Sequence, residues 1–272
     1  MNDRTKPLFV STAIPYVNAA PHVGHAFELV LGDALSRHHR QRGRAVFLSG
    51  GTDDHSLKNA RAAAERGVST AALVAEHAAI YRRLHRALDI ELDGWLRTSN
   101  DPRHLPAVTE LWNRCAAAGD LYQDEYSGLY CTGCEAFVSE AELVQGGCAT
   151  HRDPLERVQE KNWFFRLSRY ESALLAALES RTLRVEPRER HNEVLSFVRS
   201  GLRDFSVSRS HSRARGWGLP VPGDPSQVIY VWFDALTNYL SVLGHPESTQ
   251  DFERFWRGPC DREHLIGKDV LR

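Results

Sequence analysis

The sequence lacks a long apolar run, a large excess of either charge, and an N-terminal stretch with the features of a secretory signal. Its longest uncharged apolar stretches fall well short of the roughly 18 residues that cross a bilayer, which excludes a spanning helix. The N-terminal stretch is charged at its start, and its short apolar part is broken by Pro15, unlike a signal peptide. We find no internal repeat and no low-complexity linker. The absences favour a globular protein that makes no membrane contact.

The charge balance excludes a protein that binds nucleic acid through a bulk basic field. Lysine and arginine total 34 residues against 35 aspartate and glutamate residues, which gives a net charge of −1. Any nucleic-acid partner would therefore meet a local patch. The 272 residues are 42% hydrophobic and 25% charged, which is ordinary for a globular chain, and at about 150 residues per domain they predict two domains.

Cysteine is sparse and odd in number, but three of the five cysteines are crowded together. An odd count without a secretory signal indicates the reducing cytoplasm, where clustered cysteines serve more often as metal ligands than as disulfides. Cys131 and Cys134 are separated by two residues, and Cys148 and His151 repeat that spacing. Three thiolates and one imidazole would complete a tetrahedral shell, which is typical of a structural zinc ion. The alternative is a pair of unrelated surface turns with free thiols.

The N-terminal third predicts a parallel βαβ unit. Residues 7–14 form a strand-like run, residues 25–42 follow a helical period, and residues 45–50 form a second apolar strand. The helix is expected to carry an apolar face made of Phe27, Val30, Leu31 and Leu35. In such a unit, ligands bind at the carboxyl ends of the strands.

Later segments alternate between helical patterns and short strands. Helices are predicted at 56–66, 69–88, 103–118 and 168–180. Residues 121–165 are short, aromatic and rich in glycine and cysteine, and we expect them to form an inserted subdomain, followed beyond residue 180 by a mixed stretch. The apolar run at 228–236 predicts a strand that passes into a helix, and the arginine-rich stretch at 208–218 is either a basic patch or a solvated loop.

The most informative short motif runs from Pro21 to His25 and reads PHVGH, at a strand-to-helix junction. A helix N-terminus attracts anions, Gly24 lets a nucleotide approach the backbone, and the imidazoles of His22 and His25 can donate to phosphoryl oxygens. A motif this short is weak alone, and the competing interpretation is that both histidines cap or pack the helix.

The motif resembles the HIGH signature of class I aminoacyl-tRNA synthetases, and PYVNAAPHVGH is most similar to the version in methionyl-tRNA synthetases. The resemblance continues in order along nearly the whole chain. Its further blocks are FLSGGTDDH, GLYCTGCEAFVSEAELVQGGCATHRDPLE, KNWFFRLSRY, HNEVLSFV, DFSVSR, WGLPVPGD, YVWFDALTNYLS and HLIGKDVL.

The resemblance implies an α/β fold: a Rossmann-type parallel sheet, incomplete here, with an inserted zinc-binding connective subdomain. It divides the chain into a first catalytic half at 1–118, a connective insertion at 119–225 and a return to the catalytic core at 226–272. The implied metal ligands are Cys131, Cys134, Cys148 and His151.

The resemblance also implies residue roles. His22 and His25 would be the catalytic histidines that stabilise the transition state at the ATP phosphates. The implied ATP-binding residues are Asn18, His22, Gly24, His25 and Lys268. The implied methionine-binding residues are Ile14, Tyr16, Asp53, Trp232, Ala235 and Tyr239, with Asp53 receiving the α-ammonium group. From the residues alone, Asp53 or Asp54 could instead cap the following helix.

The function implied is adenylation of methionine with ATP and Mg²⁺, then transfer to the initiator and elongator methionine tRNAs, in a protein with structural Zn²⁺. The sequence departs from the family's pattern at Asp54 and Ser56, where glutamate and glycine are usual. It also contains no KMSKS loop and no anticodon-binding domain, so we expect the N-terminal part of a synthetase whose activity alone is doubtful. The alternatives are a synthetase-like paralog that activates an amino acid for small-molecule biosynthesis, or a catalytically dead zinc-bearing module that binds tRNA or another partner.

Overall fold

The fold is known from a computed structural model. It describes residues 6–131, 136–138, 143–144, 146–149 and 155–271. Cys134 and His151, two of the four expected zinc ligands, lie outside these residues. Within the described ranges, none of the helices is both long and apolar enough to cross a membrane.

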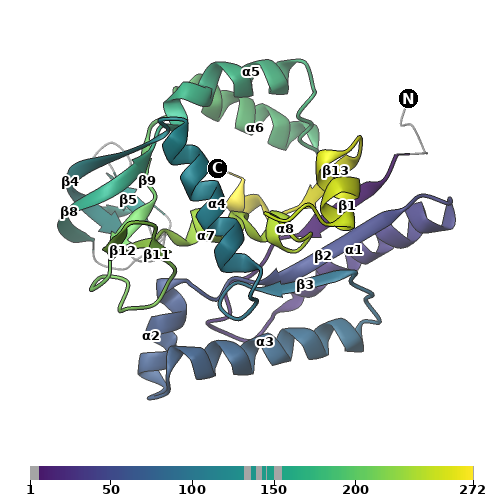
Figure 1. Ribbon diagram of the computed structural model, residues 1–272, viewed down its shortest axis with the longest axis horizontal. Coiled ribbons are helices and arrows are strands. Elements are labelled where there is room, and N and C mark those ends of the chain that lie inside the picture. The colour runs from purple at the N-terminus through teal and green to yellow at the C-terminus, as the bar shows by residue number, and fades with distance from the viewer. Residues whose placement is uncertain (1–5, 132–135, 139–142, 145, 150–154, 272) are drawn as a thin grey trace.

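A four-stranded parallel sheet forms the centre of the molecule, in the order β13-β1-β2-β3 (Figure 1). Its strands are β1 (Leu8–Thr12), β2 (Val46–Thr52), β3 (Gly94–Arg97) and β13 (Asp261–Leu265). The predicted strands at 7–14 and 45–50 are confirmed, and β13 falls in the block before GKD. The last strand therefore pairs with the first, and Thr12 lies opposite Leu265.

Helices follow these strands along the chain, the last of them leading from β3 into the inserted segment. They are α1 (Val23–Gln41), α2 (Leu57–Glu65), α3 (Thr70–Ala87) and α4 (His104–Ala117), and all four were predicted within a few residues. Side chains alternate between the two faces of a strand. Leu8 and Val10 pack with Leu29 of α1 and Ile90 after α3 on one face of the sheet, whereas Phe9 packs on the other.

The opposite face is covered by C-terminal helices. They are α8 (Asn238–Ser241), α9 (Gln250–Phe252) and the π-helical turn η3 (Glu253–Arg257). The same part of the chain also contains α7 (Val231–Leu236) and, after β13, the 3₁₀ turn η4 (Lys268–Val270). Phe9 and Phe47 pack there against Val242, Phe252 and Phe255. Residues 242–255 thus complete the core on this face of β1 and β2.

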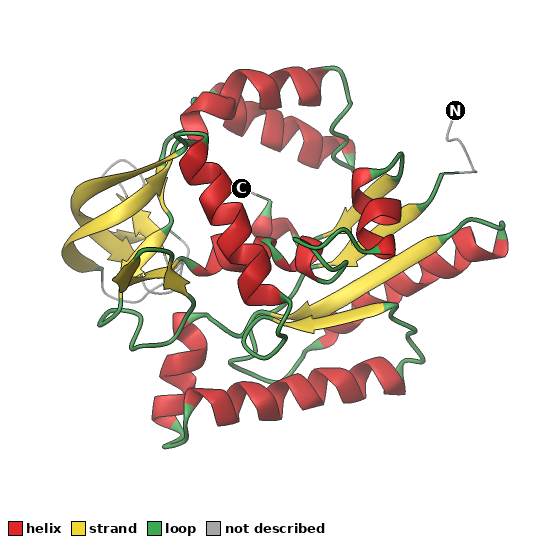
Figure 2. Ribbon diagram, viewed as in Figure 1, coloured by secondary structure: helices red, strands yellow, loops and turns green. Residues whose placement is uncertain are grey.

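The inserted segment forms antiparallel sheets that lie apart from the central sheet (Figure 2). Its strands are β4 (Leu121–Cys131), β5 (Ala136–Val138), β6 (Leu143–Val144), β7 (Gly147–Cys148), β8 (Glu156–Phe165), β9 (Phe205–Ser206), β10 (Ser208–Ser210), β11 (Pro220–Val221) and β12 (Asp224–Ile229). The long β4–β8 ribbon joins β5 and β9 in the order β5-β4-β8-β9, while β10-β12-β11 form a second sheet. Trp112 of α4 packs between them with Val207 and Ile229.

The mixed stretch expected beyond residue 180 contains a helix that the sequence analysis missed. The turn η2 (Leu167–Tyr170) and α5 (Glu171–Glu179) match the predicted helix, and α6 (Arg188–Arg199) packs beside α5. Only a narrow stripe of α6 is apolar, including Val194 and Val198, so charged residues conceal its period.

The expected strand at 228–236 is wrong over most of its length. Strand β12 ends at Ile229, extended Tyr230 precedes the helix, and α7 begins at Val231. No glycine or proline marks the change, and the helix buries Val231 and Ala235, so the apolar run continues unbroken. A continuous apolar run cannot by itself distinguish a buried strand from a buried helix.

Of the expected apolar face of α1, Leu35 packs against the core formed by Leu8 and Val10, but the other three residues do not. Phe27, Val30 and Leu31 are 70%, 46% and 45% exposed. The buried face consists of Leu29, Gly32, Asp33 and Ser36. A Cβ atom at Gly32 would lie 3.0 Å from Thr12 Cγ2, so the helix approaches the sheet through small residues rather than bulky ones.

Candidate functional site

Three loops leave the central sheet at the carboxyl ends of adjacent strands. They follow β1, β2 and β13, and the Ala13 amide donates to the Leu265 carbonyl at 3.0 Å, which aligns the first and last of them. In open parallel sheets, this edge is where ligands bind. The expected site residues outside the metal cluster lie on these loops, on the start of α1, or on α7 and α8.

The N-terminus of α1 is capped by its own motif. His22 is the N-cap residue, and its Nδ1 accepts from the Gly24 amide at 3.0 Å. The His22 amide donates back to His25 Nδ1 at 3.2 Å, which completes a reciprocal capping box. The capping interpretation of these histidines is therefore confirmed, and it leaves the exposed imidazole of His22 at a helix end that attracts anions.

The two imidazoles lie close to each other, with ring centroids 4.0 Å apart. Burial, followed by the charge of His22, lowers the pKa of His25, whose ring also meets the edge of Tyr81. A Cβ atom on Gly24 would lie 2.8 Å from His22 Cε1, so this position needs glycine for the cap to form. Asn18 and Lys268 are exposed on the loops after β1 and β13.

Asp53 lies where β2 ends and is 3% exposed. An isolated parallel bridge pairs it with Tyr16, and its amide donates to the Pro15 carbonyl at 2.9 Å. The alternative that an aspartate caps α2 is wrong, because Ser56 is the N-cap and accepts from the Lys58 amide. The Asp53 carboxylate is thus held beside the loop after β1.

Asp54, a departure from the family's pattern, is fully buried and serves as a hydrogen-bond centre. One carboxylate oxygen accepts from Thr52 Oγ1 at 2.7 Å, and the other accepts from Arg97 and from Ser99 Oγ. The Trp217 indole N–H donates to the Asp54 carbonyl at 2.6 Å. Asp54 therefore fastens the end of β2 to the end of β3.

Three residues of the expected methionine pocket, Ile14, Tyr16 and Tyr239, lie at the same edge of the sheet. Burial, followed by the charge of Glu28, raises the pKa of Tyr239 to about 12, and the Ile14 backbone hydrogen-bonds its hydroxyl group. The Lys58 ammonium lies 5.3 Å from the Tyr16 ring centroid. Ile14 and Tyr16 thus reach Tyr239 and Asp53, respectively.

Trp232 and Ala235 come from α7, three positions apart, and therefore share one face of that helix. Gly51 of β2 allows β3 and Ile14 to pack closely against it. A Cβ atom at this position would lie 2.3 Å from the Leu96 carbonyl oxygen and 3.2 Å from Ile14 Cγ2.

A buried network that the sequence analysis missed joins these parts. Asp234 Oδ2 lies 2.6 Å from His55 Nδ1, and Asp234 Oδ1 lies 2.5 Å from His104 Nε2. His104 Nδ1 in turn lies 2.9 Å from Ser241 Oγ. The only signal in the sequence was the chemistry of the residues themselves, because nothing in their spacing indicates that they meet.

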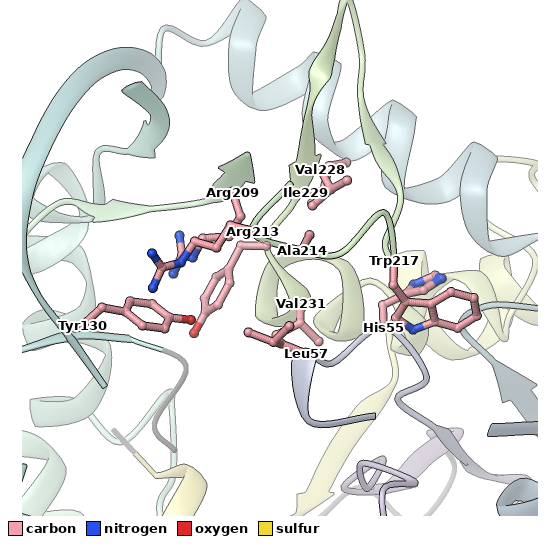
Figure 3. Close-up of a pocket in the computed structure, with 11 residues that line it drawn as sticks. His55, Leu57, Tyr130, Arg209, Arg213, Ala214, Trp217, Val228, Ile229 and Val231 are labelled. Atoms are coloured by element: carbon pink, nitrogen blue, oxygen red, sulfur yellow. The ribbon is translucent and has the colours of Figure 1, made fainter. Parts of the chain in front are cut away.

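A pocket opens beside this network, between the loop after β2 and the inserted segment (Figure 3). Trp217 and His55 lie on one side of it, and the Arg209 and Arg213 guanidinium groups lie near Tyr130 on the other. Arg209 is 7% exposed and donates to Ser206 and to the Ser208 carbonyl. The expectation of a basic patch or a solvated loop is therefore wrong at Arg209, which turns inward.

The expected zinc ligands can be placed only in part. Cys131 ends β4 and is buried, and Cys148 ends β7 and is half-buried. Among the described residues, no group of three histidine, cysteine, aspartate or glutamate side chains is arranged to hold a metal ion. Thiolate pairs are suitable donors for zinc, but Cys134 and His151 lie outside the described part.

Comparison with known proteins gives one consistent family. The family model described as tRNA synthetases class I (M) matches residues 8–157 and 150–272. A methionine–tRNA ligase of Mycobacterium tuberculosis (strain ATCC 25618 / H37Rv) is 46% identical over 272 residues, which cover 98% of this chain and 51% of that protein. One from Mesorhizobium japonicum is 42% identical over 268 residues, which cover 97% of this chain and 50% of that protein.

Solved structures agree with the sequence comparison. M. tuberculosis methionyl-tRNA synthetase in complex with methionyl-adenylate has a TM-score of 0.91 at 45% identity, covering 98% of this chain and 52% of that chain. The free state of that protein has a TM-score of 0.82 at 41% identity, covering 100% of this chain and 52% of that chain. The chain thus spans about half the length of the relatives it matches.

Proposed function

The chain belongs to the class I tRNA synthetase family of the methionine type, and from this we propose that it carries the methionine and ATP sites of a methionine–tRNA ligase. The complete activity would join methionine to ATP and then transfer it to methionine tRNAs, both initiator and elongator. The observation that carries the proposal is the bridge between Tyr16 and Asp53, which places a buried carboxylate beside the loop that leads to the capped α1.

The first proposed step is attack of the methionine carboxylate on the α-phosphorus of ATP. A bond forms between a carboxylate oxygen and phosphorus, pyrophosphate leaves, and methionyl-adenylate results. Asp53 would bind the α-ammonium group, because a buried carboxylate in a dry site gives a strong charge-assisted hydrogen bond. Ile14, Tyr16, Trp232, Ala235 and Tyr239 would enclose the side chain, since aromatic rings make favourable contacts with a thioether.

The phosphates would lie at the N-terminus of α1. His22 and His25 would donate to phosphoryl oxygens as negative charge shifts toward the leaving group, and Asn18, Gly24 and Lys268 would line the nucleotide. Such chemistry depends on positioning and electrostatics more than on covalent help. In the second step, a terminal ribose hydroxyl of tRNA would attack the methionyl carbonyl and release AMP.

Two metals belong to the proposal. Mg²⁺ would neutralise charge on the ATP phosphates, whose oxygens are the hard ligands that it prefers. A structural Zn²⁺ would be held by Cys131, Cys134, Cys148 and His151. It would fix the tip of the inserted segment. We propose that this segment is the domain at 119–225, between the two parts of the catalytic core at 1–118 and 226–272. Such a role in translation fits the cytoplasm.

The test is calorimetric titration of the 272-residue chain with methionine, and with a non-hydrolysable sulfamate analogue of methionyl-adenylate. We expect both to bind, and we expect the leucine counterpart to bind at least about tenfold more weakly, as pocket discrimination of this kind allows. Asp53→Asn should weaken both methionine ligands. Preferred binding of another amino acid would instead indicate a synthetase-like paralog, and no binding of any adenylate analogue would contradict the proposal.

A further inference from the structure

Helix α7 has two functional sides. Trp232 and Ala235 share the face assigned above to the methionine side chain. Asp234 follows Trp232 by two positions, which is about 200° around a helix of 3.6 residues per turn, so it projects to the opposite side. Its side chain is completely buried.

The Asp234 carboxylate joins three segments that are distant in the sequence. Its two oxygens contact His55 on the loop after β2 and His104 at the start of α4, at 2.6 and 2.5 Å. His104 is also fully buried, and its second nitrogen reaches Ser241 Oγ on α8 at 2.9 Å. Both carboxylate oxygens and both His104 nitrogens are therefore engaged.

His55 and Asp234 each favour the charged form of the other. Burial alone would lower the pKa of His55, but the Asp234 charge and hydrogen bond, with a contribution from Asp54, raise it. Burial alone would raise the pKa of Asp234, but the charge of His55 and the hydrogen bonds from His104 and His55 lower it to about 2. A buried ion pair holds its partners in a narrow range of geometry, because each is costly to leave unpaired.

His55 transmits this constraint to Asp53. The His55 amide donates to Asp53 Oδ1 at 3.3 Å, and the Asn59 amide group donates to the Asp53 carbonyl at 3.0 Å. The His55 ring is also packed against Trp217, with centroids 5.7 Å apart. Fixing the His55 ring therefore fixes the backbone turn that carries the Asp53 carboxylate.

We propose that Asp234, held by His55 and His104, is a positioning residue that sets the distance between the Asp53 carboxylate and the side-chain pocket on α7. The inference rests on the function proposed above, in which these two parts grip opposite ends of one amino acid. It assigns to Asp234, His55 and His104 no contact with substrate. They act by holding the Asp53 carboxylate at the distance from the side-chain pocket that one bound amino acid spans.

The test uses a matched pair of sulfamate analogues of methionyl-adenylate that differ only in the α-amino group. In the unchanged chain, the analogue with the amino group should bind more tightly, because it reaches Asp53. Asp234→Asn should weaken that analogue by about tenfold or more, as expected for loss of a hydrogen bond between charged groups, and should change the affinity of the des-amino analogue less than twofold. His104→Gln should act in the same direction.

His85→Gln is the matched control. His85 is 3% exposed and stacks edge-on against Trp95, and among the described residues its ring nitrogens have no hydrogen-bond partner. This substitution removes a buried imidazole without touching the network, so the ratio of the two affinities should stay unchanged. A merely structural role for Asp234 would weaken both analogues together, and that result would overturn the proposal.

Hydrogen exchange separates failure of this inference from failure of the proposed function. The amides of Asp53 and His55 should exchange faster in Asp234→Asn, with or without a ligand, while amides of β1 stay protected. If the unchanged chain bound neither analogue, the proposed function would fail, and the exchange rates would still decide the positioning role. Unchanged exchange at Asp53 and His55 would overturn it.

Discussion

Asp54 and Arg97 form a largely buried ion pair, with Asp54 Oδ2 2.9 Å from an Arg97 Nη atom and the Asp54 side chain wholly inaccessible. The pair joins the carboxyl ends of β2 and β3, next to the residue proposed to bind the α-ammonium group. Asp54 is thus a structural clamp between the two strand ends.

Asp54→Ala should destabilise the fold strongly. It would leave the Arg97 guanidinium and the hydroxyls of Thr52 and Ser99 without their acceptor, and breaking a buried pair costs about 3–5 kcal/mol. Urea denaturation followed by circular dichroism measures the loss. Glu110→Ala, which breaks the exposed pair with Arg114 on α4, should cost no more than about 0.5 kcal/mol. Equal losses in the two variants would contradict the clamp.

Stability should fall at alkaline pH because of His55. Its pKa is raised in the folded state, so its contribution is fully present below its unfolded value, about 6.5, and is lost as pH rises through the folded value. The Asp234 contribution has the opposite sign: it is present above about 4 and is lost as pH falls toward the folded pKa of about 2. The difference in unfolding free energy between the unchanged chain and His55→Gln should therefore shrink as the pH rises above about 6.5. A difference that stays constant with pH would contradict the raised pKa of His55.

Gly51→Ala should be poorly tolerated. The new Cβ atom would lie 2.3 Å from the Leu96 carbonyl oxygen, a backbone atom of the neighbouring strand that cannot turn away. Overpacking of this kind costs about 1–3 kcal/mol. Gly267→Ala is the control, since no described atom lies within 4 Å of the corresponding Cβ position. Thermal unfolding of both proteins measures the effect, and similar melting temperatures would refute the close approach.

His22→Ser should separate the capping role of His22 from its proposed role at the phosphates. Serine is a good N-cap residue, so stability should stay close to that of the unchanged chain, whereas His22→Ala should lose about 1 kcal/mol. Both variants should bind the sulfamate analogue of methionyl-adenylate more weakly, because neither offers an imidazole donor. If His22→Ser binds the analogue as well as the unchanged chain does, His22 acts only as a cap.

One zinc ion per chain is expected from mass spectrometry of the intact protein. Cys131→Ser should lower that stoichiometry, whereas Cys260→Ser, a change at a free thiol remote in sequence from the cluster, should leave it at one. Removing the metal with a chelator should loosen the β4–β5 end of the insertion, measured by proteolysis. Metal-free protein with a disulfide between Cys131 and Cys148 would contradict the zinc site.

Local signals were enough to predict the βαβ core from the sequence. Residues close together in the sequence are enough to indicate each of its parts. These parts are the helical periods of α1 to α4, the strands around Val10 and Leu48, and the strand-to-helix motif at His22. Two errors have one cause: an apolar pattern shows that residues share a face but not what covers that face. Phe27 lies on the outer side of α1, and the run that includes Trp232 bends from strand into helix.

The network around Asp234 could not be predicted in the same way. Asp234 is 179 residues from His55 and 130 from His104, so only the folded topology shows that they meet. In sequence, Asp234 stands in an apolar run, whereas His55 and His104 stand in short polar stretches, and nothing marks the three as partners. By contrast, the resemblance singled out Asp53, and the structure puts it directly after a buried strand, where parallel sheets place ligand-binding side chains.

The pairing of β13 with β1 has a consequence for how this protein is made. Ser11 and His264, which are hydrogen-bonded at 2.6 Å, are 253 positions apart. During synthesis, β1, β2 and β3 leave the ribosome long before β13, so one edge of β1 waits without its partner while the insertion is translated. Contacts this distant in sequence slow folding. The nascent chain therefore exposes an open strand edge until β13 is translated, the interval in which chaperones would most affect its yield.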